Sequence, residues 1–210
     1  MREKKFNMLT KIGLCAAIFI IGTAIAYNCT SSVNTCSVAT ECKSSTKATK
    51  ILPLIDNYQE QYFTIVKRNN VFLNDEDRED LKKDRKELKK LFKEVEKQIT
   101  NKKYLKEYRA IEKRYAKCDE ITTVGMNEFA QKNYNEVDAL LNKVYNEVLK
   151  NISDYDRNNL VQSETKWLKE VEDYNSVFNS MGFGTIGTII YYDYEINMRQ
   201  FRTLLLMLYL

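Results

Sequence analysis

Residues 126–152 read MNEFAQKNYNEVDALLNKVYNEVLKNI. The apolar residues of this stretch recur three or four positions apart for about seven turns, which is the spacing of one face of an α-helix. They are Met126, Phe129, Ala130, Tyr134, Val137, Leu141, Val144, Tyr145, Val148 and Ile152. A long helix with one apolar face must bury that face against other elements. The stretch therefore predicts an all-α fold.

Two further helices follow from the same periodicity. Ser153-Asp154 predicts a break and a new N-cap, and the next apolar positions are Leu160, Trp167, Leu168, Val171, Tyr174 and Phe178. The glycine-containing stretch Ser180–Thr188 predicts a connection. A third helix is expected from about Ile186 to the carboxyl end, through Ile189, Ile190, Tyr194, Phe201, Leu205 and Leu208. Residues 118–210 should thus form a small helical bundle of three main helices.

Residues 51–117 form a predicted charged helical region before this bundle. Ile51–Lys67 is expected to be helical with Pro53 in its opening turn, and Asn74 or Asp75 offers the next N-cap. The apolar positions then are Leu81, Leu88, Leu91, Phe92, Val95 and Ile99 and, after a break near Thr100-Asn101, Tyr104, Leu105, Tyr108, Ile111 and Tyr115. The surrounding Lys and Glu residues indicate a solvated face.

The amino terminus is typical of an export signal. Four basic residues precede the uncharged run Ile12–Tyr27, which ends in Ala24-Ile25-Ala26. This order predicts that residues 1–26 are a secretory signal peptide cleaved after Ala26. An uncleaved membrane anchor and a lipid-carrying Cys29 are the alternatives, although Asn28 does not fit the small residue expected before a lipidated cysteine. All three place the rest outside the cytoplasm, in the periplasm or at the cell surface.

Residues 27–50 are rich in Ser and Thr and have no apolar periodicity, so they predict a disordered linker. Export places Cys29, Cys36, Cys42 and Cys118 where disulfides can form, and four cysteines allow three pairings that the sequence does not distinguish. Their spacing does not match the short pairs of zinc motifs. Cys15 lies within the predicted signal.

Composition excludes several chemistries. The chain of 210 residues contains no histidine, which removes the commonest general base and metal ligand. No nucleophile–base pair is visible either, so we predict no enzyme activity, no catalytic or metal residues and no cofactor. The net charge of +4 is uneven, because residues 118–210 carry 8 basic and 14 acidic groups and residues 51–117 carry 18 and 13. A basic region can bind nucleic acid, but export argues against that partner.

Three groups of residues together resemble a known family. They are Met126-Asn127 with Ala130, Tyr134, Asp138, Leu141-Asn142 and Tyr145; Arg157, Leu160 and Ser163-Glu164 before Trp167-Leu168; and Gly184-Thr185 with Arg202-Thr203. In order and spacing, residues 118–210 resemble the LprI-type lysozyme inhibitors, a family of small exported bacterial proteins. The resemblance implies non-covalent binding that blocks a lysozyme cleft. It also implies cysteines where this chain has Phe129, Asn175 and Tyr194.

The candidate site residues form two sets. The predicted partner-binding set lies in or beside the Ser180–Thr188 loop, which could protrude or be an ordinary glycine-capped connection, and comprises Gly182, Gly184, Thr185, Gly187 and Tyr191. The second set is predicted to be structural. It comprises Met126, Asn127, Tyr134, Asp138, Asn142, Tyr145, Trp167 and Arg202. Within it, we expect Trp167 to be a core anchor and the four residues Asp138, Asn142, Tyr145 and Arg202 to form one buried polar network.

Two functions are consistent with these features. The first is lysozyme inhibition, in which the acidic residues 118–210 would steer the encounter with a basic lysozyme. The alternative is a structural or adaptor protein of the cell envelope, in which residues 51–117 pair with a partner helix. Under either function, membrane contact is expected only through the N-terminal segment. The sequence gives no indication of the oligomeric state.

Overall fold

The computed structural model describes residues 48–68, 78–180 and 184–210, all within one compact unit, Lys43–Leu210. These residues form six α-helices and no strand, so the predicted all-α fold is confirmed. The helices are α2 (Ala48–Arg68), α3 (Arg78–Gln98), α4 (Lys102–Arg114), α5 (Thr123–Asn151), α6 (Asp154–Ser180) and α7 (Gly184–Met207).

Helix α2 begins earlier than the sequence predicts. The predicted start is Ile51 with Pro53 in the opening turn, whereas the helix begins at Ala48 and Pro53 lies in its second turn. Proline has no backbone N–H to donate at that position. The helix nevertheless continues to Arg68, and its buried side chains, which include Ile55 and Tyr62, are held by tertiary packing.

Polar side chains mark where helices begin. The Asn101 side chain accepts a hydrogen bond from the backbone N–H of Lys103 at 3.0 Å, at the start of α4. The Ser153 hydroxyl accepts one from the backbone N–H of Asp156 at 3.1 Å, at the start of α6. Each bond satisfies a donor that has no partner within the first helical turn. Both predicted breaks between helices are therefore confirmed.

The cap of α5 leads to a testable prediction. The Thr122 hydroxyl oxygen accepts a hydrogen bond from the backbone N–H of Gly125 at 3.0 Å. We expect Thr122→Ala to lower the free energy of unfolding by about 1 kcal/mol, because this donor loses its partner. Urea unfolding followed by circular dichroism measures the change. Thr123→Ala is the matched control and should change it by less than about 0.5 kcal/mol; equal effects of the two variants would contradict the capping role.

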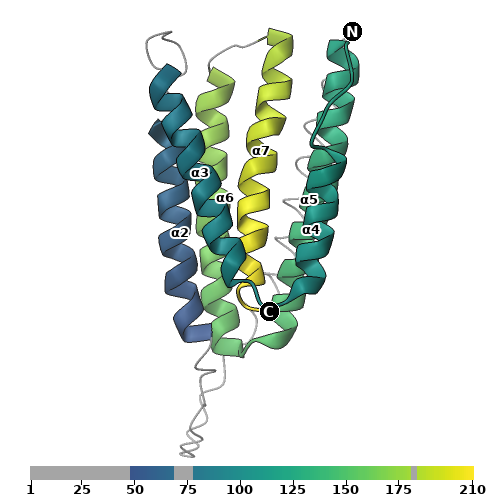
Figure 1. Cartoon of the computed structure of the whole chain (residues 1–210). Helices are drawn as coiled ribbons and strands as arrows, with labels where there is room; N and C mark the ends of the chain where they lie inside the picture. The colour runs from purple at the N-terminus through teal and green to yellow at the C-terminus, as the bar shows by residue number, and fades with distance from the viewer. Residues whose placement is uncertain (1–47, 69–77, 181–183) are drawn as a thin grey trace, which may run out of the picture. The chain divides into compact units, whose positions relative to one another are not determined.

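Consecutive helices run antiparallel (Figure 1). On α2 and α3, Arg68 lies 3.0 Å from Glu87, and the Tyr58 hydroxyl lies 3.3 Å from the Glu94 carboxylate further down the pair. Helices α5 and α7 lie side by side but run parallel, since the connection through α6 returns the chain to the same end. Their shared end, where both helices begin, is called the α5–α7 end below.

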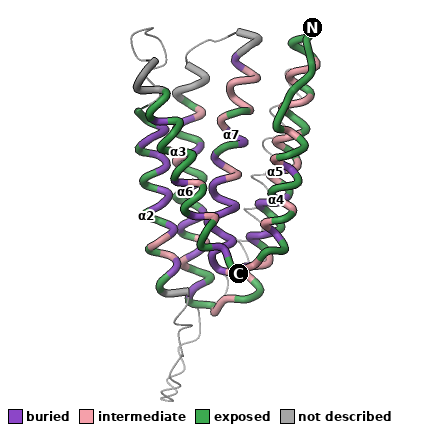
Figure 2. Tube along the Cα trace, in the orientation of Figure 1, coloured by how far each residue is buried: buried purple, intermediate pink, exposed green. Residues whose placement is uncertain are grey.

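Helix α7 is the central helix of the unit. Every residue from Phe201 to Tyr209 is buried, and Figure 2 shows this part of α7 as a continuous buried segment. The Phe201 ring stacks on Tyr62 with ring centroids 4.7 Å apart and packs against Phe92 at 4.9 Å. A helix that is apolar on all sides needs neighbours on all sides. Helices α2, α3, α4, α5 and α6 all contact α7.

Helices from both sides of the predicted domain boundary at 117/118 share this core. The rings of Tyr62 and Phe92 come from α2 and α3, and they pack on Phe201 of α7. Residues 51–117 and 118–210 therefore pack together within the unit Lys43–Leu210. The four-segment division of the chain stays a prediction about its domain organisation.

Several predictions lie outside the described residues. They concern the signal or anchor at 1–26, most of the linker at 27–50 with Cys29, Cys36 and Cys42, and the N-cap at Asn74 or Asp75. Cys118 is described, and its thiol is exposed and free. Among helices α2 to α7, none combines the length and apolar composition needed to span a membrane.

Candidate partner-binding site

The predicted Ser180–Thr188 loop is mostly helical. Helix α6 continues to Ser180 and α7 begins at Gly184, so the prediction of a nine-residue loop is wrong. Gly184 and Thr185 open α7, whereas Gly182 lies outside the described residues. Gly187 is buried in the first turn. Packing of α7 against α5 outweighs the low helix propensity of these glycines.

Three aromatic side chains line the seam between α5 and α7. The ring of Tyr134 lies 5.6 Å from that of Tyr192, which lies 5.8 Å from the ring of Tyr191. All three residues are half-buried and are called the tyrosine cluster below. Burial first, and the nearby Glu195 carboxylate second, raise the pKa of Tyr191 to about 12. The cluster therefore offers partly accessible, uncharged aromatic surface, which protein interfaces commonly use.

Unsatisfied polar atoms occur on the same part of α5. The amide oxygens of Asn127 and Asn133 are buried and have no hydrogen-bond partner among the described residues. Ile121 and Val124, at the start of α5, are 90% and 69% exposed. A buried acceptor without a donor costs free energy that a new donor can restore. The α5–α7 end thus combines exposed apolar groups, the tyrosine cluster and two buried acceptors that have no partner among the described residues.

An ionic network lies against the Tyr134 ring of the tyrosine cluster. Arg199 lies with its guanidinium 4.6 Å from the centre of the Tyr134 ring and with its Nε 2.9 Å from the Asp138 carboxylate. Its Nη1 also pairs with Glu195, which is 1% exposed. The second Glu195 oxygen accepts a hydrogen bond from the Asn175 amide at 2.5 Å. This network connects α5, α6 and α7 and fixes the orientation of the ring above it.

A second network, centred on Arg202, lies deeper. The Arg202 guanidinium is 1% exposed and donates to the Glu164 carboxylate at 2.9 Å and to the Ser163 hydroxyl at 3.2 Å. Its Nη1 donates to the Gln59 side-chain oxygen at 2.6 Å. The Trp167 ring lies about 6 Å from the guanidinium, at a cation–π distance. Three polar partners therefore surround the guanidinium and connect α2, α6 and α7.

The polar residues predicted as one network separate into two. Asp138 belongs to the Arg199 network. The Asn142 amide donates a hydrogen bond to the Asp138 carboxylate at 3.0 Å, although Asn142 is exposed. Arg202 belongs to the other network, and Tyr145 is buried. Trp167 is 3% exposed. Met126 and Asn127, in contrast, lie half-buried at the α5–α7 end.

Sequence reasoning missed Arg199, Glu195 and Gln59. The first two are four residues apart on α7, a spacing that identifies a possible ion pair on one helix face. Nothing in the sequence indicates Gln59, because it is separated from Arg202 by 143 positions. Only the packing of α2 against α7 brings these two side chains together.

Noncovalent contacts occupy the positions where the family resemblance implies cysteines. Phe129 packs edge-on against Tyr115 with ring centroids 5.1 Å apart. Tyr194 stacks on Tyr174 at 4.0 Å, and Asn175 bonds Glu195. Positions 175 and 194 therefore still connect α6 to α7, through a hydrogen bond and a ring stack.

The described residues form a helical bundle with an aromatic seam between α5 and α7. A family model described as "Lysozyme inhibitor LprI" matches residues 114–206, from the end of α4 to the last turn of α7. The resemblance found from the residues of 118–210 is thereby confirmed over this segment, which is a little under half of the chain. No curated protein and no solved structure matches the chain.

Proposed function

We propose that this is an exported, non-enzymatic protein that binds a lysozyme and blocks its cleft without covalent chemistry. The observation that carries the proposal is the match of residues 114–206 to the lysozyme inhibitor family model. Lysozymes cleave glycosidic bonds with a pair of carboxylates in a cleft. An inhibitor therefore needs only a surface that fits and occludes this cleft.

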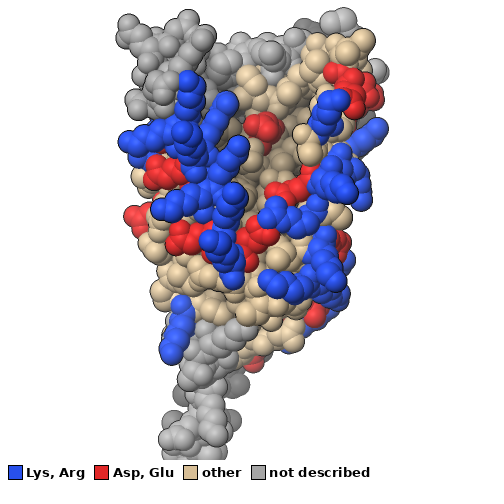
Figure 3. Space-filling view, in the orientation of Figure 1, with Lys and Arg blue, Asp and Glu red and all other residues tan. Residues whose placement is uncertain are grey.

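Charge supports a basic lysozyme as the partner. Residues 118–210 carry six more acidic than basic groups. Figure 3 shows basic Lys and Arg side chains gathered over α3 and α4. These two helices come before the family-matched segment, which begins at the last residue of α4. A basic partner would be attracted to the acidic part of the chain and repelled from the basic face. Such steering raises the rate of association most strongly at low salt.

The α5–α7 end is the proposed contact surface. It presents the tyrosine cluster and the exposed side chains of Ile121 and Val124, and Gly184 and Thr185 lie at the start of α7. Aromatic side chains on a rigid support lose little conformational freedom on binding and dominate many interfaces. The Arg199 network supplies that rigid support.

Export enters the proposal through the sequence and the family. The basic residues, the run Ile12–Tyr27 and the Ala24-Ile25-Ala26 site support secretion, and lysozymes act on cell walls outside the cytoplasm. Signal cleavage, an uncleaved anchor and lipidation at Cys29 all agree with this location. Mass spectrometry of the chain after expression in a bacterium distinguishes these three alternatives, because each gives the mature chain a different mass.

The adaptor alternative has less support. It requires the apolar stripes of residues 51–117 to be free for a partner helix. In the structure, Val95 of α3, Ile99 just after α3, and Tyr104, Tyr108 and Ile111 of α4 are already buried in the bundle. A partner helix would have to displace these contacts.

A turbidity assay tests the proposed function. The chain, titrated into a basic lysozyme acting on bacterial cells, should inhibit lysis at micromolar concentration, more strongly at low salt than at physiological salt. Residues 118–210 alone are unsuitable, because removal of α2 and α3 would expose Phe201. Absence of inhibition at micromolar protein in both salts would rule out the proposal.

Two single tyrosine variants, one at the proposed contact surface and one away from it, test where the lysozyme binds. We expect Tyr191→Ala to weaken inhibition by roughly tenfold or more, as loss of an aromatic anchor does in other interfaces. Tyr155→Ala is the matched control, since Tyr155 is 62% exposed at the opposite end of the bundle. Inhibition curves and helical circular dichroism are measured together. Equal potency of the two variants would place the contact surface elsewhere.

A further inference from the structure

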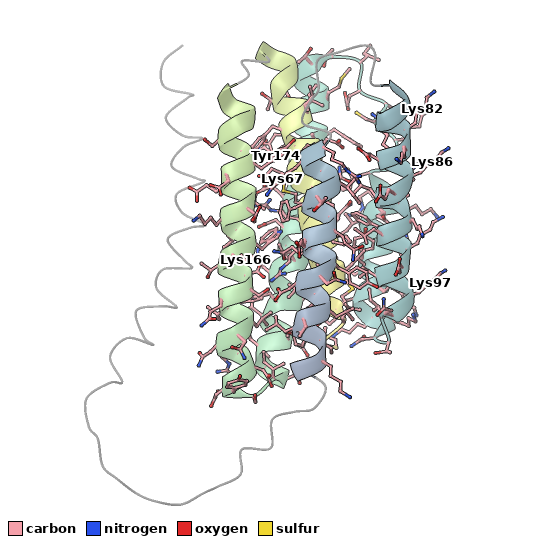
Figure 4. All side chains as sticks on the ribbon, turned by 90° about the vertical axis from the view of Figure 1, so that its left-hand side faces the viewer. Lys67, Lys82, Lys86, Lys97, Lys166 and Tyr174 are labelled. Atoms are coloured by element: carbon pink, nitrogen blue, oxygen red, sulfur yellow. The ribbon has the colours of Figure 1, made fainter. Side chains whose placement is uncertain are left out.

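Helix α3 carries a row of five exposed lysines that the proposed function does not use, and the exposed Lys82 and Lys89 lie beside this row. The row consists of Lys83, Lys86, Lys90, Lys93 and Lys97. Their spacings of three, four, three and four residues place them on one helical face for about 21 Å. All five are exposed, on the side of α3 opposite the buried Leu91 and Val95. Figure 4 shows Lys86 and Lys97 projecting away from the bundle on the same side.

The lysine row has no carboxylate partners, although α3 contains several carboxylates. Asp84 and Glu87 pair with Arg68 of α2 at 3.5 and 3.0 Å, and Glu96 pairs with Arg109 of α4. Glu94 accepts a hydrogen bond from the Tyr58 hydroxyl of α2. These four carboxylates are thus held toward α2 and α4, the neighbours of α3. Among the described residues, none forms an ion pair or a hydrogen bond with a lysine side chain of the row.

One end of the lysine row opens into a basic groove between α3 and α4. The groove has a volume of about 300 Å³ and is lined by Lys93, Glu96, Lys97, Lys102 and Leu105. The Lys102 ammonium is positioned by a 2.8 Å hydrogen bond to the carbonyl of Ile99. The only carboxylate of the lining, Glu96, is occupied by Arg109. Three lysines therefore line a space large enough for an anionic group.

We propose that the lysine row binds a linear polyanion with a phosphate in each repeat, lying along α3 and ending in the groove. Lysine presents a compact charge with donors in several directions, which suits phosphate groups whose positions are not fixed. Like charges three and four residues apart repel one another along a helix. A bound polyanion neutralises this repulsion, so the ligand also stabilises α3.

The carboxylates that flank the lysine row favour a thin chain over a membrane surface. A plane of anionic headgroups would lie against the flanking carboxylates as well as the lysines, and Glu87 is 45% exposed on one of these flanks. A linear polymer can follow the row and avoid them. The row lies outside residues 114–206, so this site does not depend on the proposed lysozyme binding.

Binding of fluorescently labelled inorganic polyphosphate to the full chain tests the proposal. Five lysine–phosphate contacts should make the affinity fall by roughly a hundredfold between about 50 and 200 mM salt. In the Lys86→Gln/Lys90→Gln/Lys93→Gln variant, affinity at the lower salt should fall by more than tenfold, and the loss between the two salts should be under roughly tenfold. Thermal unfolding should show that polyphosphate raises the melting temperature of the parent chain more than that of the α3 variant.

The matched control removes the same charge elsewhere. Lys132, Lys166 and Lys169 are exposed on α5 and α6, and their triple change to Gln should leave polyphosphate binding within about twofold of the parent. Equal losses in the two triple variants would overturn the proposal by showing a net-charge effect. Unchanged binding in the α3 variant would overturn it too. So would binding to phosphatidylglycerol vesicles without binding to polyphosphate, which would identify a membrane surface instead.

Discussion

Replacing Arg202 with methionine is expected to lower the free energy of unfolding by about 3–5 kcal/mol. Arg202 and its partner Glu164 are 1% and 4% exposed, so neither charge is solvated in the folded chain. Without the guanidinium, the carboxylate stays buried with no opposite charge, and the Gln59 oxygen loses its donor. Urea unfolding measures this loss of free energy directly, provided that the slope of the unfolding free energy against urea concentration is the same in both chains.

Two further variants separate charge burial from packing. Arg202→Met combined with Glu164→Met removes both charges and should recover at least about 1 kcal/mol of the loss, because no unpaired charge remains. Arg157→Met is the surface control. Arg157 pairs with the exposed Asp154 at 3.5 Å, and its loss should cost under about 1 kcal/mol. If Arg202→Met cost no more than the surface control, the buried network would not be a structural element.

The sequence predicted the helices better than their partners. The periodic apolar residues of α5 and the Ser153 cap identified where α5 ends and α6 begins, because these signals are local. The glycines between Ser180 and Thr188 predicted a loop, yet α7 already begins at Gly184. Glycine weakens a helix by about 1 kcal/mol at each position, and packing in a bundle exceeds that cost.

The candidate site was predictable only where its residues lie in one helix. Trp167 and Arg202 were identified from the family resemblance, but the grouping of Arg202 with Asp138 in one network was wrong, since Asp138 pairs with Arg199 instead. Periodicity shows which face of a helix is buried, and it does not show which helix lies opposite. The contribution of Gln59 therefore required the three-dimensional arrangement of α2 against α7.

The second large effect is expected at alkaline pH. Four tyrosines, Tyr62, Tyr108, Tyr145 and Tyr209, are at most 8% exposed. Burial is the main cause that raises the pKa of each, to about 12 for Tyr145. In the unfolded chain a tyrosine has a pKa near 10. Each tyrosine therefore keeps its proton in the folded state at a pH at which the unfolded chain releases it.

The sign of the pH dependence follows from this difference. Because the folded-state pKa is higher, the stabilising contribution is complete below pH 10 and is lost as the pH rises toward the folded-state value. At pH 11 each buried tyrosine should cost about 1.4 kcal/mol, and the four together about 6 kcal/mol. Domains are typically stable by about 5–15 kcal/mol, so the chain should approach its unfolding midpoint near pH 11. The chain has no histidine, and its stability should change little between about pH 6 and 9.

Tyr62→Phe identifies the cause of this alkaline unfolding. The variant retains the ring that stacks on Phe201 and removes one titrating hydroxyl. The free energy of unfolding of the variant minus that of the parent chain is the quantity to compare. This difference should be about 1.4 kcal/mol larger at pH 11 than at pH 7. Circular dichroism gives the unfolding curve, and tyrosinate absorbance shows whether ionisation accompanies it. Tyrosinate absorbance that appears well before helicity is lost would show that these hydroxyls ionise in the folded chain, and burial would then not control the transition.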